Sequence, residues 1–375
     1  MERIDLVCSE VMVKFVHTSD WHIYDKHKYS SEGKRLEEIV ANCGEIIEGA
    51  AGFGADRLII AGDIFHHYNP SERLVKYFAA LMVKAMSLGV KVRVIIGQHD
   101  TNGTDWSLQS LTTYLESVYQ RIGRDLDEGG HSFFPDEYLK IYPGGSGFVE
   151  KIEDVNFYYV SWAPNAEELI KGIKVVEGEF NVLVAHAGIL GAVTPSGHMM
   201  KRGYMDANAL SKFDYVAMGD FHNSQTIAGN IHFCGAPMRF RWDERENDLG
   251  YNLIEMGEKP HIHRVPLTDI EMIQTTIAVK DINDDIALEI DGKKVKDAVL
   301  KIAVKGKLSD SKRVQLKAGL YEAGARQVYI KNEKQVISLE GDGVDVAGLS
   351  IIDMIEKQEL DVPLKKYGVE IAAQI

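Results

Sequence analysis

The amino-acid sequence predicts an α/β protein with a smaller second domain. Short apolar segments rich in β-branched residues alternate with segments of helical periodicity, and the pattern changes after about residue 266. Strands that alternate with helices are typical of α/β folds, and continuous apolar runs are typical of strands buried on both faces. A chain of 375 residues is long enough for one large domain and one small one.

Six segments are predicted to be buried strands: 13–17 (VKFVH), 57–63 (RLIIAGD), 92–97 (VRVIIG), 181–186 (NVLVAH), 213–220 (FDYVAMGD) and 231–235 (IHFCG). Two segments between the early strands are predicted to be helices. One covers residues 33–54 and ends at its glycines, and the other runs from Pro70 to Gly89. Residues 122–150 are rich in Gly, Asp and Pro, which is consistent with an excursion from the main pattern or with loops.

The domain division follows these patterns. Residues 1–11 are predicted to be a leader or an extension, with Met12 as the natural start. Residues 12–265 form the main domain, 266–340 a small α+β domain with a β–α–β pattern, and 341–375 a helical tail. In that tail, one helix face is expected to carry Leu349, Ile352, Met354, Ile355 and Leu360.

Composition excludes several classes of protein. No apolar run approaches the roughly 18 residues of a membrane span, and the acidic first residues do not form a secretory signal. Three widely spaced cysteines argue against a disulfide framework and favour a reducing cytoplasm. The net charge of −14 argues against a protein that grips nucleic acid with its whole surface.

Polar side chains follow the predicted strands where each one ends. The set comprises Asp20, His22, Asp63, Gln98, His186, Asp220 and His222, with His66 and His99 beside them. Ligands of α/β proteins bind beyond the carboxyl ends of the strands, so these loops are expected to converge on one crevice.

Seven oxygen and nitrogen donors are about what two hydrated divalent metals need when one carboxylate bridges them. Carboxylates, an amide and imidazoles suit manganese, magnesium or iron better than a soft metal. Two such metals make a nucleophilic hydroxide near neutral pH and clamp the oxygens of a phosphoryl displacement. Each motif alone is more often a cap, a turn or a satisfied polar residue. Five of them in order, each at a strand end, favour the metal site.

This ordered pattern resembles the calcineurin-like metallophosphoesterase superfamily. Three segments, FVHTSDWHI, LIIAGDIFHHYNPS and FCGAPMRFRWDE followed by GYNLIE, resemble one branch over roughly residues 12–265. That branch is the nuclease subunit of the SbcC–SbcD double-strand-break repair complex, with its phage and archaeal relatives. The resemblance implies a four-layer α-β-β-α sandwich flanked by helices, with a small capping domain.

The resemblance also implies roles for the site residues. Asp20, His22 and His222 would bind the first metal, Asp63 would bridge, and Gln98, His186 and Asp220 would bind the second. His99 would assist the leaving 3′ oxygen, and His66 would position the phosphate. Manganese is the expected metal, with magnesium as the alternative. The implied activities are 3′→5′ exonuclease and endonuclease, in a homodimer with a coiled-coil ABC-type ATPase on which the tail would dock.

Two residues depart from the family pattern. Gln98 stands where the family has Asn, and Asp220 stands where it has His. Gln keeps the amide oxygen but adds a methylene, and aspartate is a harder, anionic ligand. Both departures fall on the second metal, so this site is either retuned as a pair or weakened. Retuning is favoured, because both replacements still offer oxygen.

The surface prediction concerns DNA. Lys201, Arg202, Arg239, Arg241 and Trp242 lie near the metal-bearing loops in sequence, where arginine and an aromatic ring could hold a backbone and stack a base. A solvated charge cluster with a partly buried Trp explains them equally well. The sequence leaves three functions open: the DNA nuclease, a phosphoesterase acting on small phosphodiesters or phosphoproteins, and a scaffold whose second metal site has decayed.

Overall fold

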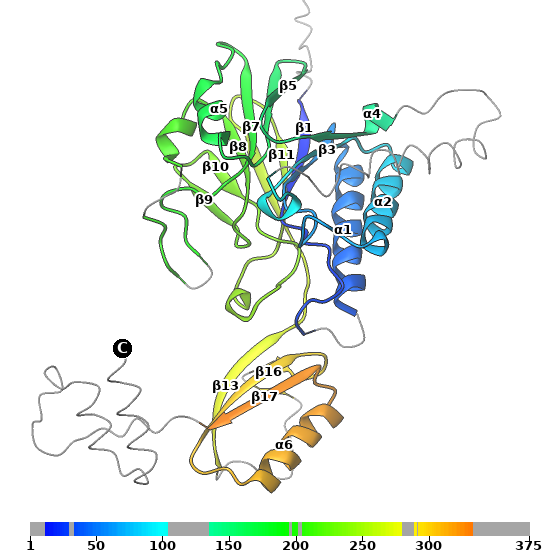
Figure 1. The fold of residues 1–375 in the computed structure, drawn as a ribbon, viewed down its shortest axis with the longest axis vertical. Helices are drawn as coiled ribbons and strands as arrows, with labels where there is room; N and C mark the ends of the chain where they lie inside the picture. Colours follow the sequence, from blue (N-terminus) through cyan, green and yellow to red (C-terminus); the bar gives the residue numbers. More distant parts are fainter. Residues whose placement is uncertain are drawn as a thin grey trace, which may run out of the picture. The chain divides into compact units, whose positions relative to one another are not determined.

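The structure is a computed structural model that describes residues 12–29, 34–103, 135–194, 197–201, 205–279, 289–290 and 292–332 (Figure 1). The predicted leader, Arg202 and the predicted tail 341–375 lie outside these residues. The described residues up to Lys331 belong to one compact unit. The division into domains at residues 265 and 340 therefore stays a prediction.

The first sheet has six strands in the order β12-β11-β1-β2-β3-β4. These strands are β12 (His261–Pro266), β11 (Gly250–Glu255), β1 (Lys14–Thr18), β2 (Arg57–Ala61), β3 (Val92–Ile95) and β4 (Leu139–Tyr142). The strands from β1 to β4 are parallel, while β11 and β12 run antiparallel to their neighbours. The carboxyl ends of β1, β2 and β3 therefore meet at one edge of this sheet.

The second sheet also has six strands, in the order β5-β6-β7-β8-β10-β9. They are β5 (Gly147–Ile152), β6 (Val155–Val160), β7 (Phe180–His186), β8 (Tyr215–Gly219), β10 (Ile231–Phe233) and β9 (Gln225–Ile227). Strands β6, β7, β8 and β10 are parallel, and β5 and β9 are antiparallel at the two edges. The carboxyl ends of β7 and β8 carry His186 and the loop of Asp220.

The two sheets pack face to face with helices outside them, which confirms the predicted four-layer sandwich (Figure 1). Between the sheets lies an apolar layer in which the Phe15 ring meets Phe157 and Tyr215 edge to face. Helices α1 (Lys34–Phe53) and α2 (Glu72–Ser87) bury their apolar faces on the first sheet. The short helices α5 (Ala166–Gly172) and η2 (Ala207–Leu210) cover the second. Burial of each large apolar side chain in these layers stabilises the fold by roughly 2 kcal/mol.

A smaller sheet follows β12. It has the order β13-β16-β17, formed by β13 (Met272–Ala278), β16 (Val299–Lys305) and β17 (Gln327–Asn332). Helix α6 (Asp310–Glu322), N-capped by Ser309, buries Leu316 and Leu320 in an apolar cluster with this sheet. The predicted β–α–β pattern is confirmed. A two-stranded ribbon of β14 (Glu289–Ile290) and β15 (Lys293–Lys294) accompanies it.

The interpretation of residues 122–150 as loops is wrong in the described part. Helix α4 (Pro135–Tyr138), β4 and the start of β5 lie there. Alternation of polar and apolar residues in β5 follows its place at the edge of the second sheet, where every other residue is exposed. Strand β6, with the sequence VNFYYV, is fully buried but was not predicted.

Candidate metal centre

All seven predicted metal ligands lie in the loops at the carboxyl ends of five parallel strands. Asp20 and His22 follow β1, Asp63 follows β2, and Gln98 begins the 3₁₀ turn η1 (Gln98–Asp100) after β3. His186 ends β7, and Asp220 and His222 follow β8. Backbone hydrogen bonds join the first two loops, from Asp20 N to Gly62 O and from His22 N to Asp63 O, each 3.0 Å long. The predicted convergence is therefore present.

Four of these seven residues have a left-handed backbone conformation. The φ angles are 54° at Asp20, 42° at His22, 52° at Asp63 and 106° at Asp220. Residues other than glycine rarely have positive φ, and each such residue costs on the order of 1 kcal/mol or more. Eight described non-glycine residues have positive φ, and half of them are in this set. Such strain is tolerated where the surrounding structure holds a side chain in a required direction.

Glycines allow the strands to end this close together. A Cβ on Gly97 would lie 2.0 Å from Asp63 Oδ1, and a Cβ on Gly62 would lie 2.4 Å from His186 Nδ1. A Cβ on Gly219 would lie 2.0 Å from the Ala61 carbonyl oxygen and 2.5 Å from His186 Nδ1. Any side chain at these positions would push Asp63 or His186 away, so the glycines keep space for the cluster.

Asp20, His22 and His222 form the first group. Their donor atoms lie within 4.8 Å of one another, and the two Nε2 atoms of His22 and His222 are only 3.1 Å apart. Asp20 is fully buried, and burial raises the pKa of its carboxyl group. A hydrogen bond from Ser19 Oγ at 2.6 Å opposes this rise, because it stabilises the carboxylate. Burial likewise holds the pKa of His22 well below its usual value, so this imidazole stays neutral and can donate its lone pair.

Asp63 and His186 lie at the centre of the cluster, buried together with Asp20. His186 Nδ1 faces the Ala61 carbonyl oxygen at 2.7 Å, so it carries the ring proton in the neutral form. Its Nε2 lies 3.5 Å from Asp63 Oδ2. Burial opposes both charges, but their attraction raises the pKa of His186 and lowers that of Asp63. The pair therefore favours a positive charge between Nε2 and the carboxylate. A proton supplies this charge in the metal-free protein, and a divalent metal ion would supply it when bound.

Gln98 and Asp220, the two departures from the family pattern, contact each other directly. Gln98 Nε2 donates to Asp220 Oδ1 at 2.6 Å. With its amide nitrogen on Asp220, Gln98 keeps its carbonyl oxygen for another partner. Both side chains line the same pocket as His22, Asp63 and His222. The departures are therefore physically coupled, as the retuning hypothesis requires.

Glu244 forms a hydrogen bond with His222 and orients its ring. The sequence did not predict this residue as part of the site. It lies in the 3₁₀ turn η3 (Trp242–Glu244), is fully buried, and its Oε1 is 2.9 Å from His222 Nδ1. Its other oxygen accepts from the backbone nitrogens of Phe240 and Arg241. Burial disfavours the charged ring, but Glu244 overcomes this and raises the pKa of His222 to about 9. Nδ1 thus carries a proton, and Nε2 is turned toward Asp20 and His22.

Asp100, the last residue of η1, fixes the loops that carry the predicted catalytic histidines. It is buried and accepts hydrogen bonds from the backbone nitrogens of Ile64, Phe65 and Gly97 at 3.0 to 3.1 Å. Burial, together with the charge of Asp63, raises its pKa to about 7. The loop sequence GQHD contained this residue, but its type alone did not distinguish a buried loop anchor from a ligand.

His99 and His66 lie side by side at the mouth of the cluster. Their rings stack with centroids 5.3 Å apart, and His99 Nδ1 contacts the His66 carbonyl oxygen at 3.0 Å. His99 Nε2 then points into the pocket, 4.0 Å from Asp63 Oδ2. Burial, and secondarily the neighbouring His99, lowers the pKa of His66 to about 4, so its ring is neutral at neutral pH.

A pocket of about 470 Å³ opens over the cluster. Lys26, Lys28 and Arg241 also line it, and they place positive charge at the mouth of a site on an acidic protein. Cationic side chains attract phosphate groups and can offset the negative charge of the carboxylates in the cluster. The sequence prediction included Arg241 but not the two lysines.

Among the other predicted DNA-binding residues, Arg239, Trp242 and Lys201 do not line this pocket. Arg239 donates to the Ile270 and Asn247 carbonyl oxygens, so its guanidinium is engaged in contacts within the protein. The Trp242 indole donates to Gln274 at 3.1 Å and has Lys301 Nζ 4.1 Å from its ring centroid. Lys201 is exposed, and it is not among the residues that line the pocket.

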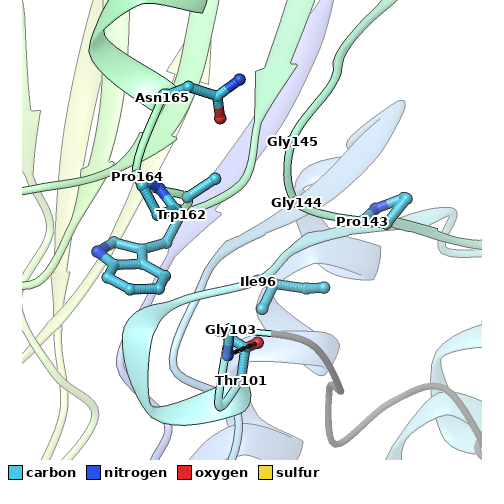
Figure 2. A pocket seen from close by; sticks show the side chains of 10 residues that line it. Ile96, Thr101, Gly103, Pro143, Gly144, Gly145, Trp162, Pro164 and Asn165 are labelled. Atoms are coloured by element: carbon cyan, nitrogen blue, oxygen red, sulfur yellow. Dashed lines mark hydrogen bonds between the residues drawn. The ribbon is translucent and has the colours of Figure 1, made fainter.

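A second pocket, of about 220 Å³, borders the other end of the same β3 loop (Figure 2). Ile96, Thr101 and Gly103 contribute to it from this loop, and Trp162 and Asn165 from the loop after β6. None of its ten lining residues is ionisable. The described part of this pocket therefore offers no acid, base or charged ligand, in contrast to the metal centre.

Comparison with known families identifies the chain at the level of its class. Residues 13–224, more than half of the chain, match the calcineurin-like phosphoesterase family, and the chain belongs to this family. It is accordingly a metal-dependent phosphodiesterase with the α/β sandwich of that family. The family implies divalent metal ions, and the buried histidines and aspartates described above fit them.

Individual relatives are more distant. The chain is 21% identical over 277 residues to the D subunit of nuclease SbcCD from Staphylococcus saprophyticus, covering 70% of this chain and 72% of the relative. It is 24% identical to the corresponding SbcCD nuclease subunit of Escherichia coli K12, over 62% of each chain. It is 23% identical to the DNA double-strand break repair protein Mre11 of Haloferax volcanii, over 96% of this chain and 76% of the relative.

None of the helices in the described ranges has both the length and the apolar character that a bilayer span requires.

Proposed function

We propose that the chain is a metal-dependent DNA nuclease, the nuclease subunit of an SbcC–SbcD-like DNA repair or end-processing complex. The observation that carries this proposal is a pocket lined by five of the seven candidate ligands and by three cationic side chains. The two remaining candidates, Asp20 and His186, are buried and have donor atoms within 4.8 Å of that of Asp63. The names of the relatives, a nuclease SbcCD subunit and the DNA double-strand break repair protein Mre11, favour DNA as the substrate.

Two divalent ions, manganese in the first place, would be held by the two groups of the cluster. Asp20, His22 and His222, whose donor atoms lie together, would hold one ion. His186, whose donor atom lies close to that of Asp63, would hold the other together with the joined pair Gln98 and Asp220, and Asp63 would be shared between the two ions. Harder oxygen donors in the second group favour manganese or magnesium over zinc. When bound, such ions supply Lewis acidity toward the phosphodiester and lower the pKa of water.

The histidines at the pocket mouth would handle the proton and the phosphate. His99 Nδ1 is held by the His66 carbonyl oxygen, which aims Nε2 into the pocket. A protonated His99 would then donate from Nε2 to the departing 3′ oxygen, as general acid catalysis requires. His66 stays neutral near pH 7, and its ring N–H can hydrogen-bond a phosphate oxygen.

The DNA backbone would approach over Lys26, Lys28 and Arg241 at the pocket mouth. Trp242 with Lys301 on its ring offers a cationic aromatic surface beyond them. A net charge of −14 still opposes DNA binding over the rest of the surface. We therefore expect the isolated chain to cleave DNA weakly, and to depend on an ATPase partner and a homodimeric assembly for tight binding. Buried free thiols at Cys43 and Cys234 agree with a reducing cytoplasm.

The test compares substrates at low salt with manganese. A labelled blunt-ended duplex, a small chromogenic phosphodiester and a phosphopeptide are incubated with the full chain and with its Asp63→Asn variant. The proposal expects slow cleavage of the duplex from its 3′ ends, lost in the variant and strongly reduced by salt. Turnover of the small phosphodiester or the phosphopeptide with intact DNA would instead identify a general phosphoesterase. No turnover of any substrate despite bound metal would point to a scaffold.

A further inference from the structure

Another group of side chains with potential metal-binding atoms lies at the opposite end of the first sheet from the pocket. Glu255 ends β11, and His261 and His263 lie on β12, the exposed edge strand. Their donor atoms all lie within 4.8 Å of one another, and the two imidazole centroids are 4.3 Å apart. Neither histidine takes part in the catalytic cluster or lines its pocket.

The strand register explains why these three side chains meet. Glu255 pairs directly with His261 in the antiparallel β11–β12 ladder, so both side chains lie on the same face. His263 is two residues further along β12 and returns to that face, because side chains alternate along a strand. Both histidines are exposed, while Glu255 is partly buried. The arrangement is set by backbone pairing on a rigid sheet and needs no loop to move.

The position separates this group from the catalytic centre. Glu255 also pairs with Lys14, the first residue of β1, whereas Asp20 lies beyond the last residue of that strand. A strand rises about 3.3 Å per residue, so the five residues of β1 place the two groups roughly 15 Å apart.

We propose that Glu255, His261 and His263 form a separate surface site for a borderline divalent transition metal, with zinc as the best fit. Two imidazoles and one carboxylate are a zinc ligand set, and three protein ligands leave a fourth position open for water or an exogenous group. The oxygen-rich catalytic cluster favours harder ions, so the two sites select different metals.

Lys14 is the side chain that opposes this site. Its ammonium lies 2.9 Å from Glu255 Oε1, and its Nζ also sits 4.9 Å from the centroid of the Phe53 ring. A carboxylate has a second oxygen, so Glu255 can contact the ammonium and a metal together. The nearby positive charge nevertheless weakens cation binding. Removing it should strengthen binding, which gives the proposal a test that loss of fold cannot imitate.

The experiment measures zinc binding by the full chain in excess manganese, using isothermal titration and a chromophoric competitor. Wild type is compared with His261→Asn, His263→Asn and Lys14→Met. The matched control is Glu258→Gln, which removes an exposed carboxylate from the same hairpin but not from the site. Zinc that displaces manganese in the catalytic pocket does so in every variant, so the differences report the edge site.

The proposal expects one zinc more in wild type than in the doubly substituted His261→Asn/His263→Asn chain. Each single histidine variant should weaken that zinc about tenfold or more, Lys14→Met should tighten it severalfold, and Glu258→Gln should leave it unchanged. Equal zinc stoichiometry and affinity in wild type and both histidine variants would overturn the proposal. So would a loss of zinc in Glu258→Gln equal to that in the histidine variants.

Discussion

The two halves of the catalytic cluster are built in different ways. In the half formed by Asp20, His22 and His222, a buried carboxylate from outside the cluster, Glu244, orients an imidazole through its Nδ1 proton. In the half with His186, the orienting group is a backbone carbonyl oxygen, and the remaining two candidates, Gln98 and Asp220, are joined to each other. The first half keeps the family's residue types, and the second carries both replacements.

This difference teaches that the two replaced residues are joined to each other, whereas the first half relies on a carboxylate from outside the cluster. The longer Gln98 side chain reaches Asp220 and donates to it, a contact that the carboxylate of Asp220 makes possible. The contact of 2.6 Å leaves the Gln98 carbonyl oxygen available as a metal ligand, as a retuned second half requires. The second half is therefore a coupled unit, while the first depends on Glu244.

The largest expected effect concerns His99, which is a proposed proton donor and belongs to neither half. His99→Ala should lower the rate of phosphodiester cleavage by about 10²- to 10⁴-fold, because it removes the proposed proton donor. Metal stoichiometry, measured by calorimetry, should stay at the wild-type value, since no donor of either half is removed. A variant that loses metal together with activity would place His99 among the ligands instead.

The next expected effect concerns the folding stability of the second sheet, which acid should reduce through His232, a residue outside both halves of the cluster. His232 lies on β10, stacks on Tyr215 and is buried, which lowers its pKa to about 4. The unfolded chain binds this proton near pH 6.5, so the folded state holds fewer protons between these values. Stability is complete above pH 6.5 and falls as the pH drops toward 4, by up to about 3 kcal/mol for this group.

Chemical denaturation in the presence of a chelator measures this dependence without metal. The matched variant His232→Phe keeps the stacked ring and removes the titrating nitrogen. It should flatten the decline in the free energy of unfolding over this pH range. An unchanged slope in His232→Phe would assign the decline to other groups.

Glu244→Gln should weaken one half only. Loss of a carboxylate that orients a metal-binding imidazole typically costs 10- to 100-fold in metal affinity. Manganese titration should therefore show one weakened ion and one ion of wild-type affinity. Equal weakening of both ions would mean that Glu244 supports the whole loop, and the proposed difference between the halves would be wrong.

The smallest expected effect is the coupling between Gln98 and Asp220. A double-mutant cycle with Gln98→Asn and Asp220→His should give a coupling energy of about 1 kcal/mol in manganese affinity. The shorter asparagine side chain cannot reach residue 220 in the same way, so each single variant should lose affinity. Additive losses, with no coupling, would show that the two replacements arose and act independently.

Much of the fold and cluster is predictable from the sequence because strand-end motifs report directly on topology. The buried strands β1, β2, β3, β7, β8 and β10 are largely apolar, and polar residues begin where they stop. The positions of Asp20, Asp63 and His186 follow from that rule alone. Segments with alternating or mixed composition, such as β5, carry a weaker signal that does not distinguish an edge strand from a loop.

The supporting residues are not predictable in the same way. Glu244 contacts His222 from 22 residues away, in a loop that also carries partly exposed charges. Nothing in the local sequence distinguishes it from Asp243 beside it. Likewise, Arg239 and Arg241 look alike in the sequence, but one guanidinium binds backbone carbonyls and the other lines the pocket. Such differences depend on tertiary contacts that periodicity does not encode.

The most direct test of the central claim is the number of manganese ions bound to the purified full chain, measured together with cleavage of a blunt duplex. A two-metal centre with a retuned second half predicts two bound ions in wild type and in His99→Ala, with cleavage only in wild type. It also predicts that Gln98→Asn loses affinity for one ion. One bound ion in wild type, no cleavage, and no recovery of either in Gln98→Asn would contradict it and leave the second half a relic.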